Sequence, residues 1–196
     1  MDMFEAMHGR RSIRQFKDKP VPREIIQEIL EKAIWAPSNY NMQPWFFAVV
    51  AGGKKKELLE AMDDVATLVA ERVSSIFDDK MTRLVKSFTR TFGGAPVIIL
   101  AYSDRSISKM PSLPLKFNPD ILSVATAIQN LLLLVHEKGL GACWMSAAAL
   151  VEDKINSILG IKDKDLIAAI PIGYPDQSPP VPPRKGVKIG WFTSDH

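Results

Sequence analysis

A dense basic segment near the N-terminus holds the first side chains whose types and spacing could do chemistry. Arg10, Arg11, Ser12, Ile13 and Arg14 follow one another there. Guanidinium groups this close repel one another unless an anion lies between them. Arginine suits a phosphate because its planar fork donates two parallel hydrogen bonds, and Ser12 adds a hydroxyl group and a backbone N–H. The segment therefore indicates an anion site, with a solvated basic turn or a nucleic-acid-binding patch as the alternatives.

A second segment, between Pro37 and Trp45, gathers amide and hydroxyl side chains. These are Ser38, Asn39, Asn41 and Gln43. Because Asn and Gln each offer a donor and an acceptor, the segment could bind the edge of a flat heterocycle such as an isoalloxazine ring, together with the ribityl hydroxyls. The alternative is an Asn-rich turn whose hydrogen bonds are satisfied within the turn itself.

A third segment combines glycines with large side chains. Gly139 and Gly141 precede Cys143, Trp144 and Met145. Glycine allows the backbone to approach a flat ligand closely, and backbone N–H groups aimed at a flavin ring would stabilise its reduced, anionic form. The alternative is a helix end followed by a core strand, in which Cys143 is a small buried apolar residue rather than a nucleophile.

Two further cations lie in the proline-rich C-terminal segment. Arg184 and Lys185 directly follow Pro182 and Pro183, so a stiff extended chain could deliver them to a fixed place beside the first basic segment. A solvated basic tail is the alternative. The sequence has neither a dinucleotide-binding fingerprint after a strand nor a P-loop, and its three histidines are widely scattered, so a metal site or a catalytic triad has no support.

The composition excludes several classes of protein. A chain of 196 residues with 46% hydrophobic and 24% charged residues suits one soluble globular domain, and its net charge of +3 is too small to indicate a nucleic-acid binder. The lone Cys143 cannot form an internal disulfide, the N-terminal residues lack the long apolar stretch of a signal peptide, and no uninterrupted apolar run could span a membrane. We therefore expect a cytoplasmic protein that binds neither nucleic acid nor membrane.

Hydrophobic periodicity and proline positions predict the secondary structure. We expect helices over residues 2–8, 23–35, 54–92 (two helices with a break near Asp78 and Asp79), 120–138 and 151–159, and strands over 46–51, 96–102, 142–145 and 166–174. Helices interleaved with a few short strands indicate an α+β architecture, with a small sheet flanked by helices in a single domain over residues 1–196.

Three regions carry further expectations. Residues 103–119 hold three prolines and show no periodicity, which predicts a mobile loop or lid, and its residues Met110, Leu113 and Phe117 could line a substrate pocket. The helix at 120–138 is apolar around much of its circumference and needs cover on more than one side; a second copy of the chain is the simplest cover. The tail from Pro175 is expected to be extended.

Taken together, the four segments resemble the nitroreductase family of FMN proteins. The strings that carry the resemblance are Arg-Arg-Ser-Ile-Arg-Gln-Phe (10–16), Ala-Pro-Ser-Asn-Tyr-Asn-Met-Gln-Pro-Trp (36–45), Gly-Leu-Gly-Ala-Cys-Trp-Met (139–145), and Ile-Gly-Tyr-Pro with a downstream Pro-Arg-Lys (172–185). They occur in the family's order and at its rough spacing. The resemblance covers nearly the whole chain, with residues 54–92 and 103–119 the least constrained.

The resemblance implies a role for each segment. It implies that Arg10, Ser12 and Arg14 hold the FMN phosphate and ribityl chain, joined by Arg184 and Lys185, and that Arg11 contacts the phosphate or the pyrimidine side. It implies that Ser38, Asn39, Asn41 and Gln43 come from the other subunit of an intertwined homodimer. Cys143, Trp144 and Met145 would lie along the flavin ring, and the tail 175–196 would wrap the partner subunit. The implied fold is α+β, with a central antiparallel sheet between helices.

The activity implied is that of a flavin oxidoreductase. It would take hydride from NADPH or NADH and pass electrons to a small electron-poor molecule, such as a nitroaromatic or a quinone, by a ping-pong mechanism. The flavin carries the chemistry, so no catalytic side chain is expected. The alternatives are a specialised member that dehalogenates or acts on flavin itself, and a flavin-binding protein without turnover.

Overall fold

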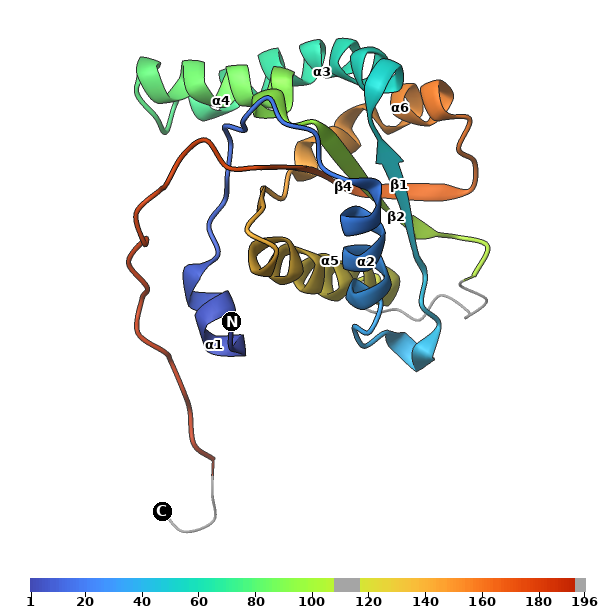
Figure 1. Cartoon of the computed structure of the whole chain (residues 1–196), viewed down its shortest axis with the longest axis vertical. Coiled ribbons are helices and arrows are strands. Elements are labelled where there is room, and N and C mark those ends of the chain that lie inside the picture. Colours follow the sequence, from blue (N-terminus) through green and yellow to red (C-terminus); the bar gives the residue numbers. More distant parts are fainter. Residues whose placement is uncertain (108–116, 193–196) are drawn as a thin grey trace.

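A four-stranded antiparallel sheet forms the centre of the computed structural model, which describes residues 1–107 and 117–192 (Figure 1). The strands are β1 (Trp45–Val50), β2 (Val97–Asp104), β3 (Gly141–Ala142) and β4 (Lys164–Gly173), in the order β1-β2-β4-β3. Every residue of β2 is buried, as the apolar run at residues 96–102 predicted. The predicted α+β architecture with a central antiparallel sheet is confirmed.

Helices cover both faces of the sheet. The α-helices are α1 (Met3–Gly9), α2 (Arg23–Ala33), α3 (Gly52–Val73), α4 (Asp79–Thr91), α5 (Pro119–Glu137) and α6 (Glu152–Leu159); the 3-10 helices are η1 (Asn39–Asn41), η2 (Phe92–Gly94) and η3 (Ser146–Val151). One hydrophobic cluster joins α2 and α5 to one face, and a second joins α3 and α6 to the other. Ile99 of β2 belongs to the first cluster and its neighbour Ile98 to the second, because successive side chains of a strand point to opposite faces.

Helix α5 is the central helix of its layer. Its residues Ile128 and Leu131 are completely buried in the first cluster. By length and composition, α5 could cross a membrane, with a mean hydropathy of 1.3 over an 18-residue window; polar residues interrupt its apolar runs, so no single run in the sequence indicated this. Within that window, 44% is buried inside the structure, and the buried residues pack in the first cluster with those of α2 and the sheet.

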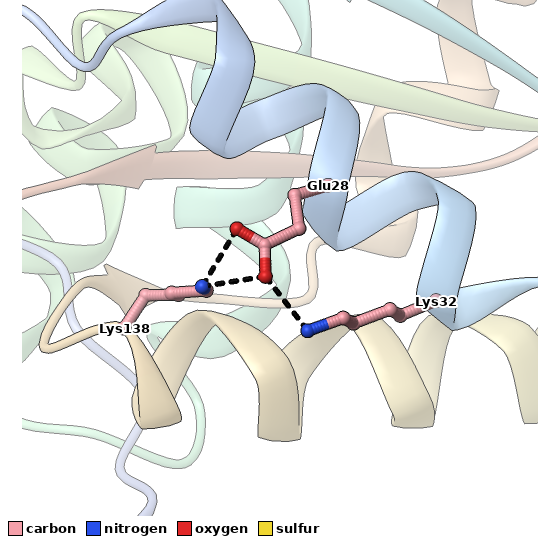
Figure 2. A network of polar contacts seen from close by, with 3 residues as sticks. All are labelled: Glu28, Lys32 and Lys138. Carbon is pink, nitrogen blue, oxygen red and sulfur yellow. Dashed lines mark hydrogen bonds and ion pairs between the residues drawn. The ribbon is translucent and has the colours of Figure 1, made fainter.

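An ion-pair network joins α2 to the residue that ends α5 (Figure 2). The Nζ of Lys138 donates to both carboxylate oxygens of Glu28, at 2.6 and 2.7 Å, and the Nζ of Lys32 donates to the same carboxylate at 2.7 Å. These hydrogen bonds, first that of Lys138 and then that of Lys32, lower the pKa of Glu28 to about 2. The network fixes the crossing of the two helices that pack side by side.

The proline-rich segment is shorter than the predicted loop at 103–119. Strand β2 continues through Asp104, and α5 begins at Pro119. Burial raises the pKa of Asp104, but hydrogen bonds from Lys164 on β4 and from Ser106 outweigh it and hold the pKa below its usual value. A carboxylate paired in this way can be buried, so its polarity did not mark the end of the strand. Of the predicted pocket residues, Met110 and Leu113 lie outside the described residues, and Phe117 is exposed.

Two other predicted features can be compared with the structure: the strand at 142–145 and the helix break near Asp78. The strand predicted at 142–145 is wrong in extent, because β3 contains only Gly141 and Ala142; Met145 instead pairs with Ala169 of β4 in an isolated bridge. The predicted break between two helices is confirmed, since α3 ends at Val73 and the Asp78 side chain caps α4 by accepting from the Met81 N–H at 2.7 Å.

The C-terminal tail leaves the body of the molecule. Residues 180–192 are all exposed, and Figure 1 shows the tail running away from the sheet. Large apolar side chains are exposed on it and elsewhere, among them Trp35 at 87%, Trp191 at 80% and Phe192 at 98%. A surface of this kind is typical of a chain that associates with another.

We predict that Glu28→Gln lowers the melting temperature at neutral pH, because it removes the charge that holds Lys138 against α2. The carboxylate contributes stability at pH values above about 4.5, its unfolded value, and that contribution is lost as the pH falls towards about 2. The difference in melting temperature between wild type and variant should therefore shrink through this window in a thermal unfolding series. Glu31→Gln is the matched control, since Glu31 accepts from the uncharged Gln27 amide of the same helix; an equal effect of both variants would contradict the prediction.

Candidate functional site

The basic segment is held beside β3 by isolated bridges, at Ser12 to Ala142 and at Phe16 to Pro175; we call residues 10–17 the strap. The Ile13 N–H donates to the carbonyl of Ala142 in β3 at 2.9 Å, and the Phe16 N–H donates to the carbonyl of Gly93 at 3.1 Å. On the tail side, the Lys17 N–H donates to the Tyr174 carbonyl at 2.9 Å. The backbone of the strap is thus fixed from three directions.

The side chains of the strap differ in burial. Ile13 and Phe16 are buried and form a small cluster with Ala95. Because successive side chains of an extended strand point to opposite sides, Ser12 and Arg14 lie on the side opposite Ile13. Gly141 permits the close approach of the strap, since an added Cβ there would lie 2.7 Å from Ile13.

The three strap arginines have different surroundings. The Nη1 of Arg11 donates to the carbonyls of His8 and Arg10, at 2.7 and 2.5 Å, so this guanidinium binds the backbone at the end of α1. Arg10 is half-buried and lines a cavity. Arg14 is exposed, and its guanidinium lies over the ring of Phe88 on α4, with the Cζ 5.7 Å from the ring centroid.

A cavity of about 420 Å³ lies between the strap, the C-terminal half of α5 and the start of the tail. Its wall includes Arg10, Arg11, Ile13, His136, Leu140 and Gln177. Burial, followed by the charges of Arg10 and Arg11, lowers the pKa of His136, so the imidazole is neutral at pH 7. The three histidines are scattered in the sequence, and His136 gains a place beside the strap only because it lines the same cavity as Arg10 and Arg11.

The segment of residues 139–145 runs beside the strap. Cys143 is buried, and burial raises the pKa of its thiol, although Arg14, the Ser12 hydroxyl and Arg10 act in the opposite sense. Trp144 is half-buried, and its indole N–H donates to the Ser146 hydroxyl at 3.0 Å. A thiol with a raised pKa is a poor nucleophile, which supports the expectation that Cys143 does no covalent chemistry.

The loop of residues 36–45 has a strained backbone, and some of its polar groups form hydrogen bonds with one another. Tyr40, Asn41 and Gln43 all have positive φ angles, at 47, 53 and 52°. Ser38 accepts from the Gln43 N–H at 3.0 Å, and the Gln43 amide donates to Asn41 at 3.0 Å. Hydrogen bonds within the turn therefore use part of the donor set, as the alternative interpretation expected. Left-handed backbone at non-glycine residues is costly and concentrates at ligand-binding sites.

The loop and the strap lie at opposite ends of α5. The Asn39 N–H donates to the Ser123 hydroxyl at 3.0 Å, near the start of α5, whereas the cavity beside the strap reaches His136 near its end. At ~1.5 Å per residue, Ser123 and His136 lie roughly 20 Å apart along the helix axis. The structure therefore does not bring Ser38, Asn39, Asn41 and Gln43 to the strap of the same chain.

The two tail cations also lie apart from the strap cavity. Arg184 and Lys185 are exposed, and the tail residues that line the cavity are Pro175, Gln177, Ser178 and Pro179. The Gln177 Oε1 accepts a hydrogen bond from the Arg14 N–H at 3.1 Å. The sequence did not indicate this contact between the tail and the strap. The joining of Arg184 and Lys185 to a phosphate stays a prediction.

Comparison with known proteins gives a consistent match. The family model described as the nitroreductase family matches residues 7–174. A protein of Bacillus subtilis (strain 168) named as an NAD(P)H nitroreductase, YfhC, is 30% identical over 185 residues, which cover 94% of this chain and 90% of that protein. Iodotyrosine deiodinase of Thermotoga neapolitana is 28% identical over 198 residues, which cover 97% of this chain and 98% of that protein.

A solved structure has the same fold. The FMN and NADPH-dependent nitroreductase NfnB from Sphigopyxis sp. strain HMH superposes with a TM-score of 0.76 at 26% identity. The superposition covers 98% of this chain and 100% of that chain.

We predict that Gly141→Ala displaces the strap and destabilises the protein by about 1–3 kcal/mol, the usual cost of overpacking a well-packed site. The new methyl group would meet Ile13 at 2.7 Å. Urea unfolding measures the effect. Gly53→Ala is the control, because a Cβ at Gly53 meets nothing within 4 Å; equal stability of the two variants would show that strap and β3 are not in close contact.

Proposed function

This chain belongs to the nitroreductase family, and we propose that it is an FMN-dependent oxidoreductase that transfers electrons from NADPH or NADH to small electron-poor acceptors such as nitroaromatics or quinones. The proposal is supported by the names of its relatives and by the donor set of the strap. It is an enzyme of the nitroreductase type, in which the donor and the acceptor occupy the same site in turn, the order called ping-pong.

The single observation that carries the proposal is the fixed strap with its two kinds of donor. Arg10 and Arg14 offer guanidinium forks, and Ser12 offers a hydroxyl group on the side opposite the buried Ile13. These donors fit a phosphate with an adjacent polyhydroxyl chain, which is the chemistry of FMN. Because backbone hydrogen bonds at Ile13 and Phe16 already fix the strap, little ordering is left for the cofactor to impose.

The chain's own residues bind and orient, and they move no proton. When bound, FMN supplies the hydride-accepting and electron-releasing ring. Cys143, Trp144 and Met145 follow the strand that pairs with the strap, and they lie along the ring in this proposal. Arg11 supports the site indirectly, because its hydrogen bonds to the carbonyls of His8 and Arg10 fix the entry of the strap.

A homodimer completes the site. The loop of residues 38–43 cannot reach the strap of its own chain, since roughly 20 Å of α5 separates them. A second copy, packed on the exposed side of α5, brings its own Ser38, Asn39, Asn41 and Gln43 to the strap. The tail then wraps the partner subunit and covers its own exposed apolar side chains. Arg184 and Lys185 lie on the same extended segment.

A specialised reaction is the second candidate function. The deiodinase of Thermotoga neapolitana is as similar to this chain as several nitroreductases are, so reductive dehalogenation of an aromatic substrate is the alternative acceptor chemistry. A flavin-binding protein without turnover is the further alternative. A cytoplasmic location, and the absence of nucleic-acid or membrane partners, stay predictions from the sequence.

We expect the protein purified without added cofactor to show the visible absorption of a flavin, and to bleach when NADPH or NADH is added without oxygen. Bleaching measures hydride uptake directly. Yellow protein that does not bleach would favour a flavin binder or another electron donor. Colourless protein that takes up no added FMN would contradict the cofactor itself.

Reoxidation of the bleached protein distinguishes the acceptors. Similar kcat/KM values for a nitroaromatic and a quinone support a generalist reductase. Rapid reoxidation by a halogenated aromatic alone, with halide release, would instead support the dehalogenating candidate.

Subunit complementation tests the shared site. We expect a strap variant, Arg10→Glu, and a loop variant, Ser38→Ala with Asn39→Ala, each to lose FMN binding as homodimers. After reassociation of an equal mixture, about a quarter of the wild-type FMN sites should return, because half of the dimers are mixed and each mixed dimer holds one intact site. No recovery by flavin absorbance, with mixed dimers present, would show that strap and loop do not meet across the interface.

A further inference from the structure

We propose that Phe88, on α4, is a positioning residue for the cofactor site, because its ring holds the Arg14 guanidinium in the orientation that meets FMN. This inference rests on the proposed function. The Arg14 Cζ lies 5.7 Å from the centroid of the Phe88 ring, within the ~6 Å over which an aromatic face attracts a guanidinium. In the sequence, Phe88 stands between Ser87 and Thr89 within the helical region of residues 54–92, and nothing beside it indicates a role at the site.

The main chain of Arg14 is fixed on both sides. Gly93, with φ at +65°, packs so closely that an added Cβ would lie 2.1 Å from the Arg14 carbonyl oxygen. On the other side, the Arg14 N–H donates to the Gln177 side chain at 3.1 Å. The Arg14 backbone is therefore fixed before any ligand binds, and the freedom that is left belongs to the side chain.

The Phe88 ring removes part of that remaining freedom. Arg14 is exposed, and a long exposed guanidinium side chain loses rotamer entropy when it binds a ligand. Phe88 is half-buried and packs against the second hydrophobic cluster, so its ring is immobilised by the core. The contact therefore restricts the Arg14 side chain, because the ring that it meets is packed in the second cluster.

The C-terminal end of α4 lies against the strap. Phe92 closes the helix in the left-handed conformation, with φ at 49°, and Gly93 follows at once. This turn places the Gly93 carbonyl against the Phe16 N–H and the ring of Phe88 one helical turn earlier against Arg14. One helix terminus thus contacts the strap twice, through its backbone at Phe16 and through the Arg14 side chain.

A double-mutant cycle on the full chain tests the role of Phe88. Apoprotein is titrated with FMN, followed by quenching of flavin fluorescence. We expect Phe88→Leu to weaken FMN binding about two- to fivefold, the factor that corresponds to the ~0.5–1 kcal/mol of an exposed cation–π contact. In an Arg14→Gln background, the same substitution should change the affinity by no measurable factor, because Phe88 acts through Arg14.

Two further variants separate positioning from packing. Phe88→Trp keeps an aromatic face and should retain wild-type affinity. Phe47→Leu removes a half-buried ring of β1 that packs on the other cluster, and it should leave FMN affinity unchanged. An equal loss from Phe88→Leu with and without Arg14 would overturn the proposal, since the ring would then act through packing alone. No loss in the wild-type background would overturn it as well.

A flavin-free measurement keeps this inference distinct from the proposed function. In the apoprotein, the side-chain Nε–H signal of Arg14, identified by its disappearance in Arg14→Gln, should be displaced by the Phe88 ring current and should move in Phe88→Leu. An unmoved signal would overturn the contact itself. A wild-type chain that shows the displaced signal but takes up no FMN would contradict the proposed function, and the positioning role with it, while the contact would stand.

Discussion

The burial of α5 along the sheet is the constraint on which the site depends. The helix must bury Ile128 and Leu131 against the sheet, so it lies flat on one face and its two ends are held far apart. The loop of residues 36–45 is anchored at its first turns through Ser123, and the strap cavity lies at its last turns beside His136. The length of one helix therefore separates the loop from the strap of the same chain, and this separation supports the proposal of a site shared between two copies.

Two glycines, which have no side chain, let neighbouring elements approach the strap closely enough to fix it. Gly141 on β3 and Gly93 after α4 leave room for backbone in which a single methyl group would collide. The strap consequently pairs with both elements and carries its arginines on a rigid main chain. The position of the strap is in this sense set by β3 and by the end of α4.

Most of the fold could be predicted from the sequence because it follows from local periodicity. The helices α2 and α5, the break at Asp78 and the buried strand β2 all have apolar spacings or caps within a few residues. The wrong boundaries arose from contacts distant in sequence. Asp104 extends β2 because Lys164 pairs with it, and Met145 pairs with Ala169 outside any regular strand, which no local pattern could indicate.

The candidate site residues stay a prediction, and the sequence indicates some of their surroundings but not others. The sequence marked the basic strap and the polar loop by residue type alone. It could not assign Arg11 to the carbonyls of His8 and Arg10, because a guanidinium near a helix end and one near a phosphate look alike in a string of letters. Phe88, Gly93, His136 and Gln177 reach the site only through the folded chain, and a single sequence carries no signal for such contacts.

The exposed tail has a consequence for how this protein comes into being. Trp191 and Phe192 are almost entirely in water in the single chain, and residues 180–192 are all exposed. If a second copy covers these rings, folding and assembly form one equilibrium rather than two. A newly made chain then exposes these rings until it meets a second copy, so the fraction of assembled protein depends on the concentration of chains.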